Sequence, residues 1–280
     1  MRNMITLLAL VAITLVPLAL PPSRAGAPPE PARLRGIVSL TPSITDSIVD
    51  LEASDLLVGV SSRHGPLPEK VEVVGDLVRV DLERIIAIAP DLVLFSAEDG
   101  STQMADRVSA IGIAVHRFGR NRDFDDICAH YLELGAMLGR EQTARARIDG
   151  YRRGLARIER PGPGPRMALF VSHVPLIPAG AASFVGKMIE SAGGRNAFAG
   201  IDRPFPVISA EHLVMCDPDI IVSIDADPES FFADKAFAGV RAVRRGAVRR
   251  IDADLVGTYT PRNYVAAAGE LGRIIADVGK

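Results

Sequence analysis

Side chains that can bind metal ions, anions and flat apolar ligands gather in a few short segments of this sequence. Arg63 and His64 are adjacent, Arg203 lies two residues before Phe205, and Tyr259 lies in the segment GTYTPR. An imidazole can ligate a metal, a guanidinium pairs with carboxylates in a fork-like geometry, and an aromatic ring offers a flat apolar face. These residue types together are suited to holding a metal chelate or an anionic ligand.

The adjacent pair Ser172-His173 raises the question of hydrolytic chemistry, because a serine next to a histidine can be activated as a nucleophile. Neighbouring residues of a strand point to opposite faces, which is poor geometry for that purpose. The sequence also contains no G-x-S-x-G, H-E-x-x-H, P-loop or G-x-G-x-x-G motif. We therefore predict that the protein is not an enzyme, with a cleft enzyme as the weaker alternative.

Alternating strands and helices must position these segments. Short apolar runs such as LRGIVSL and DLVLFS alternate with amphipathic helical stretches, which is typical of a parallel sheet. In open α/β sheets, ligands bind beyond the carboxyl ends of the strands. Because Ser96 and Glu98 lie at the end of the strand DLVLFS, they join the candidate ligand contacts. Glu98 has the alternative role of capping the helix that follows.

The periodicity changes near residue 122, where apolar residues begin to recur at helical spacing and continue to residue 160. This pattern predicts one long helical stretch, with a potential break near Gly139, before RPGPGP stops it. The predicted fold class is α/β, with two Rossmann-like lobes of mainly parallel sheet joined by a long rigid interlobe helix. The predicted domains are an N-terminal lobe over 34–121, the interlobe helix over 122–160 and a C-terminal lobe over 161–280.

The first residues have the architecture of a secretory signal. A positive start, an apolar run and then small residues predict a signal peptide over 1–25, followed by a linker over 26–33. Pro17 interrupts the run, which is shorter than the roughly 20 residues of a spanning helix, so a membrane anchor is the weaker alternative. No cysteine lies near this segment to carry a lipid. We expect a freely diffusing, monomeric periplasmic protein.

The composition argues against some partners. The 280 residues have a formal net charge of −2, so nucleic acid is not an expected partner. Trp is absent and aromatic residues make up only 5%, which limits any stacking pocket to a few Phe, Tyr and His side chains. The two cysteines, Cys128 and Cys216, lie within apolar patterns. We predict no functional thiol, and a disulfide between them stays an alternative.

One unit of sequence occurs twice. DLERIIAIAPDLVLFS, from residue 81, and SAEHLVMCDPDIIVSI, from residue 209, both read as a helix, a Pro-Asp turn and a buried strand. Glu83 and Glu211 occupy the same place in the two copies. Two related lobes would explain the repeat, although chance similarity between helix-turn-strand units stays an alternative because apolar matches are common.

The sequence resembles, in five ordered blocks, the class III periplasmic binding proteins, which feed cobalamin, haem and ferric siderophores to ABC importers. The likeness is strongest to cobalamin-binding members and covers nearly all of the chain after the signal. It implies a ligand held between two lobes, only small closure on binding, no intrinsic cofactor and no stable membrane insertion. The blocks are IVSLTPSITDSIVDL, VDLERIIAIAPDLVL, IGIAVHRF, RPFPVISAEHLVMCDPDIIV and TYTPRNYVAAAGEL.

In this family, one surface Glu on each lobe docks into Arg pockets of the two permease subunits, and the matching positions here are Glu83 and Glu211. The resemblance thus implies an ABC permease dimer with its ATPase as partner. Rim charges of this kind set approach and register on a two-fold partner. The alternative is that each Glu only favours the positive end of its helix. A ligand sensor for a membrane transducer would carry the same carboxylates and stays a further alternative.

The resemblance also ranks the ligands. Phe205 matches an aromatic position of the cleft wall, where the family often has Trp. His64 and His173, from opposite lobes, are tentative axial ligands for the two faces of a metal macrocycle, and a loop histidine without metal is the alternative for each. Arg63 and Arg203 favour carboxylates such as haem propionates. We expect a corrinoid first, with haem or a ferric siderophore close behind because the cleft tryptophans of cobalamin receptors are missing.

Overall fold

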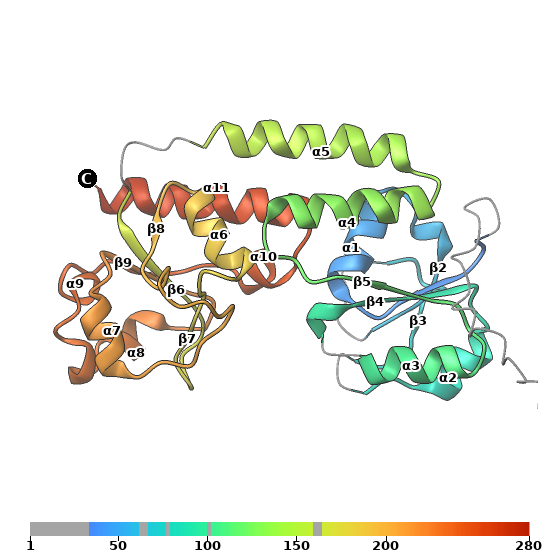
Figure 1. Ribbon diagram of the computed structural model, residues 1–280, viewed down its shortest axis with the longest axis horizontal. Coiled ribbons are helices and arrows are strands. Elements are labelled where there is room, and N and C mark those ends of the chain that lie inside the picture. Colours follow the sequence, from blue (N-terminus) through green and yellow to red (C-terminus); the bar gives the residue numbers. More distant parts are fainter. Residues whose placement is uncertain (1–33, 62–66, 77–78, 100–101, 159–163, 280) are drawn as a thin grey trace, which may run out of the picture.

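The computed structural model describes residues 34–61, 67–76, 79–99, 102–158 and 164–279, which form two α/β lobes beneath a layer of helices (Figure 1). The predicted signal peptide and linker, as well as Arg63 and His64, lie outside the described residues. Within the described ranges, no helix combines the length and the apolar character that a membrane span requires.

The N-terminal lobe contains a parallel sheet of five strands in the order β3-β2-β1-β4-β5. Residues 92–96 of the interior strand β4 are all buried, as expected where helices cover both faces of a parallel sheet. The strands are β1 (Ile37–Ser39), β2 (Leu57–Val60), β3 (Glu72–Val73), β4 (Leu92–Ser96) and β5 (Val115–Phe118). The helices are α1 (Pro42–Asp50), α2 (Leu82–Ile88) and α3 (Thr102–Ala110), with 3₁₀ turns at Ser54–Leu56 and Ala97–Asp99.

The C-terminal lobe contains a second five-stranded sheet in the order β10-β9-β6-β7, with β8 paired to β6. All of its pairs are parallel except the hairpin of β6 and β7. The mainly parallel α/β architecture predicted from the sequence is confirmed. The strands are β6 (Arg166–Ser172), β7 (Ile177–Pro178), β8 (Arg195–Asn196), β9 (Ile220–Ser223) and β10 (Val248–Arg250). The helices are α6 (Phe184–Ser191), α7 (Ala210–Cys216), α8 (Pro228–Phe232), α9 (Arg241–Arg244), α10 (Ala253–Gly257) and α11 (Pro261–Val278), with a 3₁₀ turn at Lys235–Phe237.

The interlobe stretch consists of two antiparallel helices, α4 (Phe124–Met137) and α5 (Glu141–Ala156), broken at the predicted place. Gly139 adopts φ 67°, the left-handed conformation that commonly ends a helix. Gly135 allows α5 to approach closely, because a Cβ there would lie only 2.6 Å from the Cβ of Ala144. In Figure 1, α5 lies over both α4 and α11, and so covers the junction of the two lobes.

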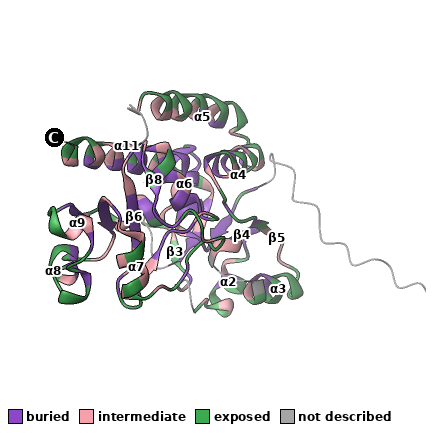
Figure 2. Ribbon diagram, turned by 60° about the vertical axis from the view of Figure 1, so that its left-hand side comes forward, coloured by how far each residue is buried: buried purple, intermediate pink, exposed green. Residues whose placement is uncertain are grey.

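The apolar core is continuous across that junction. The largest buried cluster includes Leu94 of the N-terminal sheet, Leu134 of α4, Leu271 of α11 and Leu169 of the C-terminal sheet. Two smaller clusters lie one in each lobe. Figure 2 shows the strands and inner helix faces buried and the outer face of α5 exposed. Since packed interiors resist deformation, the lobes are held at a fixed relative position.

A buried carboxylate reinforces this junction. Asp50, at the end of α1, accepts hydrogen bonds from the hydroxyls of Tyr131 at 2.5 Å and Tyr151 at 2.9 Å. Arg147 of α5 approaches the same carboxylate at 3.3 Å and Arg262 of α11 at 3.7 Å. Burial and the Asp50 charge raise the pKa of Tyr151 to about 12, so this phenol stays a donor at neutral pH. The network thus connects four helices from both lobes.

The two cysteines are free and lie in different lobes, Cys128 in α4 and Cys216 in α7. Burial raises the pKa of the Cys128 thiol to about 12, so it carries almost no thiolate at neutral pH. The disulfide that the sequence left open is not formed.

The repeated unit of the sequence is also a repeated unit of structure. α2 and α7 each end in a left-handed residue, Ala89 with φ 49° and Asp217 with φ 40°. Each unit then continues into an interior strand of its sheet, β4 or β9. The carboxylate of Asp91 accepts from the amide of Gly36 at 3.0 Å, and that of Asp219 from the amide of Arg166 at 2.9 Å. The Pro-Asp turn therefore fastens each interior strand to the start of its neighbour.

Candidate functional site

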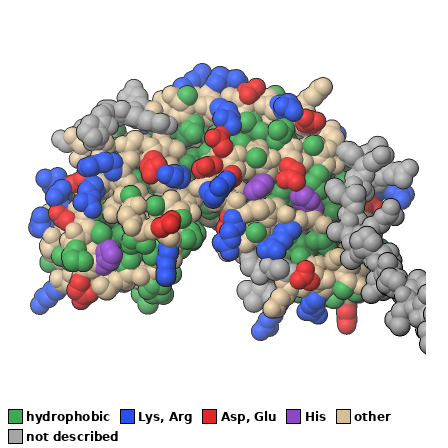
Figure 3. All heavy atoms as spheres, in the orientation of Figure 1, with side chains coloured by type: hydrophobic (Ala, Val, Ile, Leu, Met, Phe, Trp, Pro, Cys, Tyr) green, Lys and Arg blue, Asp and Glu red, His purple; other side chains and the backbone are tan. Residues whose placement is uncertain are grey.

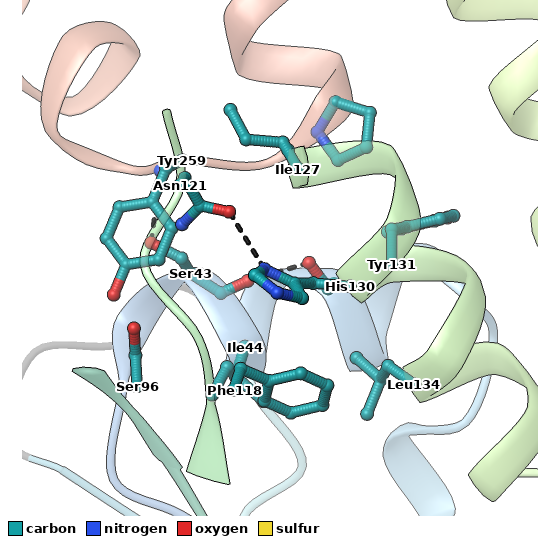
Figure 4. Close-up of a pocket in the computed structure, with 12 residues that line it drawn as sticks. Ser43, Ile44, Ser96, Phe118, Asn121, Ile127, His130, Tyr131, Leu134 and Tyr259 are labelled. Atoms are coloured by element: carbon teal, nitrogen blue, oxygen red, sulfur yellow. Dashed lines mark hydrogen bonds between the residues drawn. The ribbon is translucent and has the colours of Figure 1, made fainter. Parts of the chain in front are cut away.

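A cavity lies at the carboxyl ends of the N-terminal strands, where the two lobes meet (Figure 4). The cavity itself is small, about 30 Å³, and it opens to solvent. Figure 3 shows the molecule hollowed between the lobes at its lower edge. The cavity is lined by Ser43, Ile44, Ser47, Ser96, Phe118, Asn121, Ile127, His130, Tyr131, Leu134, Tyr259 and Pro261.

Tyr259 is the aromatic side chain that the C-terminal lobe contributes to this lining. It lies between α10 and α11, and its backbone amide donates to the hydroxyl of Ser43 of α1 at 3.0 Å. Its ring contacts Phe184 edge-on, with 5.9 Å between ring centres. These contacts fix the position of Tyr259 at the boundary between the lobes.

Ser96 and Glu98 organise the N-terminal side. Ser96 is buried at the end of β4 and lines the cavity, and its hydroxyl accepts from the Glu98 amide at 3.1 Å. One Glu98 carboxylate oxygen accepts from the backbone amide of Asn121 at 2.7 Å, and the other lies 3.8 Å from Arg120. Glu98 therefore positions the loop after β5, and the structure does not place it among the cavity-lining residues.

His130 and Asn121 form the polar pair of the cavity wall, and neither was singled out from the sequence. The Asn121 carbonyl oxygen lies 2.9 Å from His130 Nδ1. Because that oxygen only accepts, Nδ1 carries the proton, and Nε2 is an acceptor in the neutral ring. The His130 ring also packs edge-on against Phe118, with 5.8 Å between ring centres. Its position one residue before Tyr131, on the apolar side of α4, was the available sequence signal.

His173, a predicted axial ligand, lies inside the C-terminal lobe with 7% of its surface exposed. Its Nε2 is 2.6 Å from the Ser223 hydroxyl, and its ring stacks on Phe231 with 4.5 Å between centres. Burial lowers the pKa of His173 in spite of the nearby Asp225 carboxylate, which favours the neutral ring. Ligation of a metal in the cleft would require the ring to leave these partners.

Phe205 and Arg203 lie in the loop before α7. Phe205 is 40% exposed, Arg203 is exposed, and neither lines the cavity described above. The loop is held to the rest of the lobe by bonds from the amide of Gly180 to the carbonyl of Pro204, and from the amide of Ile208 to the carbonyl of Leu176. The structure thus brings Tyr259 and Ser96 together and leaves Phe205 outside that group.

Positive charge surrounds the hollow. Lys and Arg side chains lie on both sides of it in Figure 3. In the loop after β5, the Arg120 and Arg122 side chains are 67% and 79% exposed. The Arg122 guanidinium bonds Asp126 and holds the pKa of that carboxyl below its ordinary value. Within the described chain, no three His, Cys, Asp or Glu side chains converge as a metal site.

The two carboxylates that the repeat singled out are both exposed, Glu83 in the first turn of α2 and Glu211 in the first turn of α7. Asp81 caps α2 and Ser209 caps α7 at the corresponding positions. In Figure 1, both helices lie on the side of the molecule opposite α5. The two carboxylates can therefore face a common partner surface.

Two α/β lobes held at a fixed position by helices, with a cavity between them at the strand ends, define a two-lobed ligand-binding protein. Residues 37–255 match the profile described as periplasmic binding protein. The chain belongs to this family, as a class III member, and the family is composed of binding proteins.

Three known proteins place the chain within the family. The vitamin B12-binding protein of Vibrio vulnificus is 22% identical over 241 residues, which cover 84% of this chain and 88% of that protein. The cobalamin-binding protein of Halobacterium salinarum is 29% identical over 208 residues, covering 71% of this chain and 55% of that protein. The crystal structure of a periplasmic haem-binding protein of Vibrio cholerae matches with a TM-score of 0.74 and 18% identity, covering 85% of this chain and 97% of that one.

Proposed function

We propose that this protein is secreted to the periplasm, captures a metal chelate between its lobes and delivers it to an ABC importer. The single observation that carries the proposal is the interlobe cavity, which is lined by Tyr259 of the C-terminal lobe, Ser96 of the N-terminal lobe and His130 of the interlobe helix α4. The cavity is too small to enclose a macrocycle, so we assign the ligand to the open hollow between the lobes, where the cavity wall supplies apolar and aromatic contacts and a few polar groups. The fixed lobes suit a bulky, rigid ligand.

A corrinoid is the first candidate ligand, because sequence relatives are named for vitamin B12 and cobalamin. Haem and ferric siderophores are the alternatives, supported by the exposed arginines around the hollow and by the haem-binding structural neighbour. Tyr259 and Ser96 are the proposed contacts of the floor, and Phe205 and Arg203 those of the outer edge of the hollow. Arg63 and His64, which lie outside the described residues, stay candidate contacts. His130 joins them as a floor imidazole, while Glu98 acts through the loop after β5.

The test is a titration of the purified mature protein with cyanocobalamin, haemin and a ferric hydroxamate in turn, followed by absorbance and calorimetry. We expect cyanocobalamin to bind, and Phe205→Ala to weaken it about tenfold, because a large apolar contact is lost. His130→Gln should also weaken binding, whereas His212→Gln, a histidine of α7 outside the cavity, is the matched control. A Soret shift with haemin alone would select haem, and binding of none of the three would contradict the proposal.

A further inference from the structure

The two repeated helices carry the same carboxylate in different surroundings. Position by position, Glu83 of α2 corresponds to Glu211 of α7. Four residues before the carboxylate, the N-terminal lobe has Arg79 and the C-terminal lobe has Val207. Four residues after it, the N-terminal lobe has Ala87 and the C-terminal lobe has Met215. The acid is thus shared, whereas its neighbours change from basic and small to apolar and large.

These apolar neighbours of Glu211 are unusually open to solvent. Met215 is 77% exposed, Val207 67%, and Val174 in the turn between β6 and β7 is 82% exposed. The amide of Ile208 bonds the carbonyl of Leu176, so the loops that carry Val207 and Val174 lie side by side. Large apolar side chains exposed together commonly mark an interaction surface. We call Val174, Val207 and Met215 the apolar rim of Glu211.

The geometry of α7 places Met215 and the acid on one face of the helix. Residues four apart lie on the same face of a helix, so Met215 is one turn beyond Glu211 on its own side. The Ser209 hydroxyl bonds the Glu211 carboxylate and holds the pKa of Glu211 below its ordinary value, so the group is charged at neutral pH. A charge bordered by apolar groups forms a stronger pair when a partner covers it, because the border excludes water.

Glu83 has a smaller apolar border, which is Ile86, 50% exposed and three residues further along α2. Arg79 is exposed, and Arg84 follows Glu83 directly, with its guanidinium 2.6 Å from the carbonyl of Val73 and 3.8 Å from Asp81. Ala87 adds little apolar surface one turn further on. Nearby positive charges weaken the attraction of Glu83 for a cationic partner, and open water screens it. The two carboxylates are therefore unequal as contact points.

We propose that Glu211 with its apolar rim is the principal anchor on the importer, and that it fits a cation set within apolar side chains on one permease subunit. Glu83 is then the weaker, salt-sensitive contact on the other subunit. This inference rests on the proposed delivery function and deepens it, because it gives a pseudo-symmetric receptor a preferred orientation on a two-fold partner. Charge complementarity with the two exposed acids favours a basic protein surface over a second copy of this chain or an anionic lipid surface.

The test exchanges the neighbours between the lobes. Val207→Arg with Met215→Ala gives Glu211 the surroundings of Glu83, and Arg79→Val with Ala87→Met does the reverse. The readout is uptake of radiolabelled cyanocobalamin, or of whichever chelate the titration selects, by cells that lack this gene and carry each variant on a plasmid. All four positions are exposed, so circular dichroism and chelate affinity should match those of the wild type.

We expect the first exchange to raise the receptor level needed for half-maximal uptake about tenfold, and the reverse exchange to leave it unchanged or to lower it. The role of the apolar rim would be overturned if the variant Val207→Arg with Met215→Ala needed a receptor level within twofold of wild type. This outcome counts only if Glu83→Ala with Glu211→Ala abolishes uptake. If the double alanine variant also imports normally, the docking part of the proposed function fails instead.

Two further measurements address other occupants of the rim. Sedimentation of the wild-type protein should show a monomer, and a dimer that the first exchange dissociates would assign the rim to self-association. Flotation with phosphatidylglycerol vesicles should leave the protein in solution. Binding to such vesicles that the first exchange removes would assign the rim to a lipid surface. Either result would overturn the proposal.

Discussion

The unit formed by α2 and β4 and the unit formed by α7 and β9 share one backbone design but differ in how they are held. Both helices end in a left-handed residue, and both Pro-Asp turns bond the neighbouring strand through a carboxylate. At its Pro-Asp turn, the second unit adds a guanidinium. Arg241 lies 2.8 Å from the carboxylate of Asp217 and 2.5 Å from that of Asp219.

This difference separates two kinds of information in the repeat. The Pro-Asp pair and the apolar spacing are shared because each lobe needs the same turn into an interior strand. The surface charges differ because each lobe packs different elements beside that turn, and α9 with its Arg241 lies next to the second copy. Similarity between the copies therefore reports main-chain geometry, whereas their differences report local partners.

The largest expected effect is on stability, from removal of the Asp carboxylates. Asp219→Ala should lower the free energy of unfolding by about 2–3 kcal/mol. It removes the hydrogen bond that the Arg166 amide donates to Asp219, and it leaves one nitrogen of the Arg241 guanidinium without its carboxylate partner. Asp91→Ala should cost less, about 1–2 kcal/mol, since its amide partners can turn to solvent. Urea unfolding measures both. In an Arg241→Met background, Asp219→Ala and Asp91→Ala should lower the free energy of unfolding by similar amounts. A larger loss for Asp219→Ala in that background would contradict the role given to Arg241.

The next prediction is that a glycine at the left-handed residue stabilises the first unit and destabilises the second. Ala89→Gly should raise the free energy of unfolding by up to about 1 kcal/mol, because an alanine at φ 49° is strained and glycine is not. Asp217→Gly relieves a similar backbone conformation but loses two bonds to Arg241, from its amide at 2.7 Å and its guanidinium at 2.8 Å. It should therefore destabilise by about 1 kcal/mol. Thermal unfolding of the two variants is the measurement, and equal signs would break the comparison.

The smallest effect concerns acid. Although burial favours its neutral form, bonds from Arg166 and Arg241 hold the pKa of Asp219 below its ordinary value. A depressed folded-state pKa contributes stability that is present above the unfolded value, near 3.8, and is lost as pH falls through the folded value. Asp219→Asn should therefore flatten the acid side of the stability curve below about pH 4. Urea titrations at pH 5 and pH 3 measure the free energy of unfolding at the two pH values. If Asp219→Asn and the wild type lose the same free energy between them, Asp219 does not contribute to the acid sensitivity.

Much of the fold could be predicted from local pattern. Alternating strands and helices gave both sheets, and the spacing from residue 122 gave the helical stretch with its break at Gly139. The left-handed glycine is a local signal, readable from one residue type. What the pattern could not give was that α5 folds back over α4, because a break in a helix does not state the angle at which the chain continues.

The candidate site was less predictable, because its members come together only through distant contacts. The rule that ligands bind at strand ends indicated Ser96 and Tyr259, which line the cavity. His130 was missed because it lies within the helical stretch between the lobes, and its place on the apolar side of that helix does not show that the helix borders a cavity. His173 also follows a strand end, yet stacking on Phe231 turns its ring into the lobe, and that contact joins residues far apart in sequence.

The Asp50 network has a consequence for how far the two lobes can move apart. The buried Asp50 carboxylate contacts two tyrosine hydroxyls and two guanidiniums from three other helices. Rotation of one lobe against the other would therefore disturb several of these contacts together. Thermal motion alone therefore seldom separates the two lobes. If the protein delivers its ligand to an importer, as we propose, release of the ligand would then depend on work done by the importer and not on free opening of the lobes.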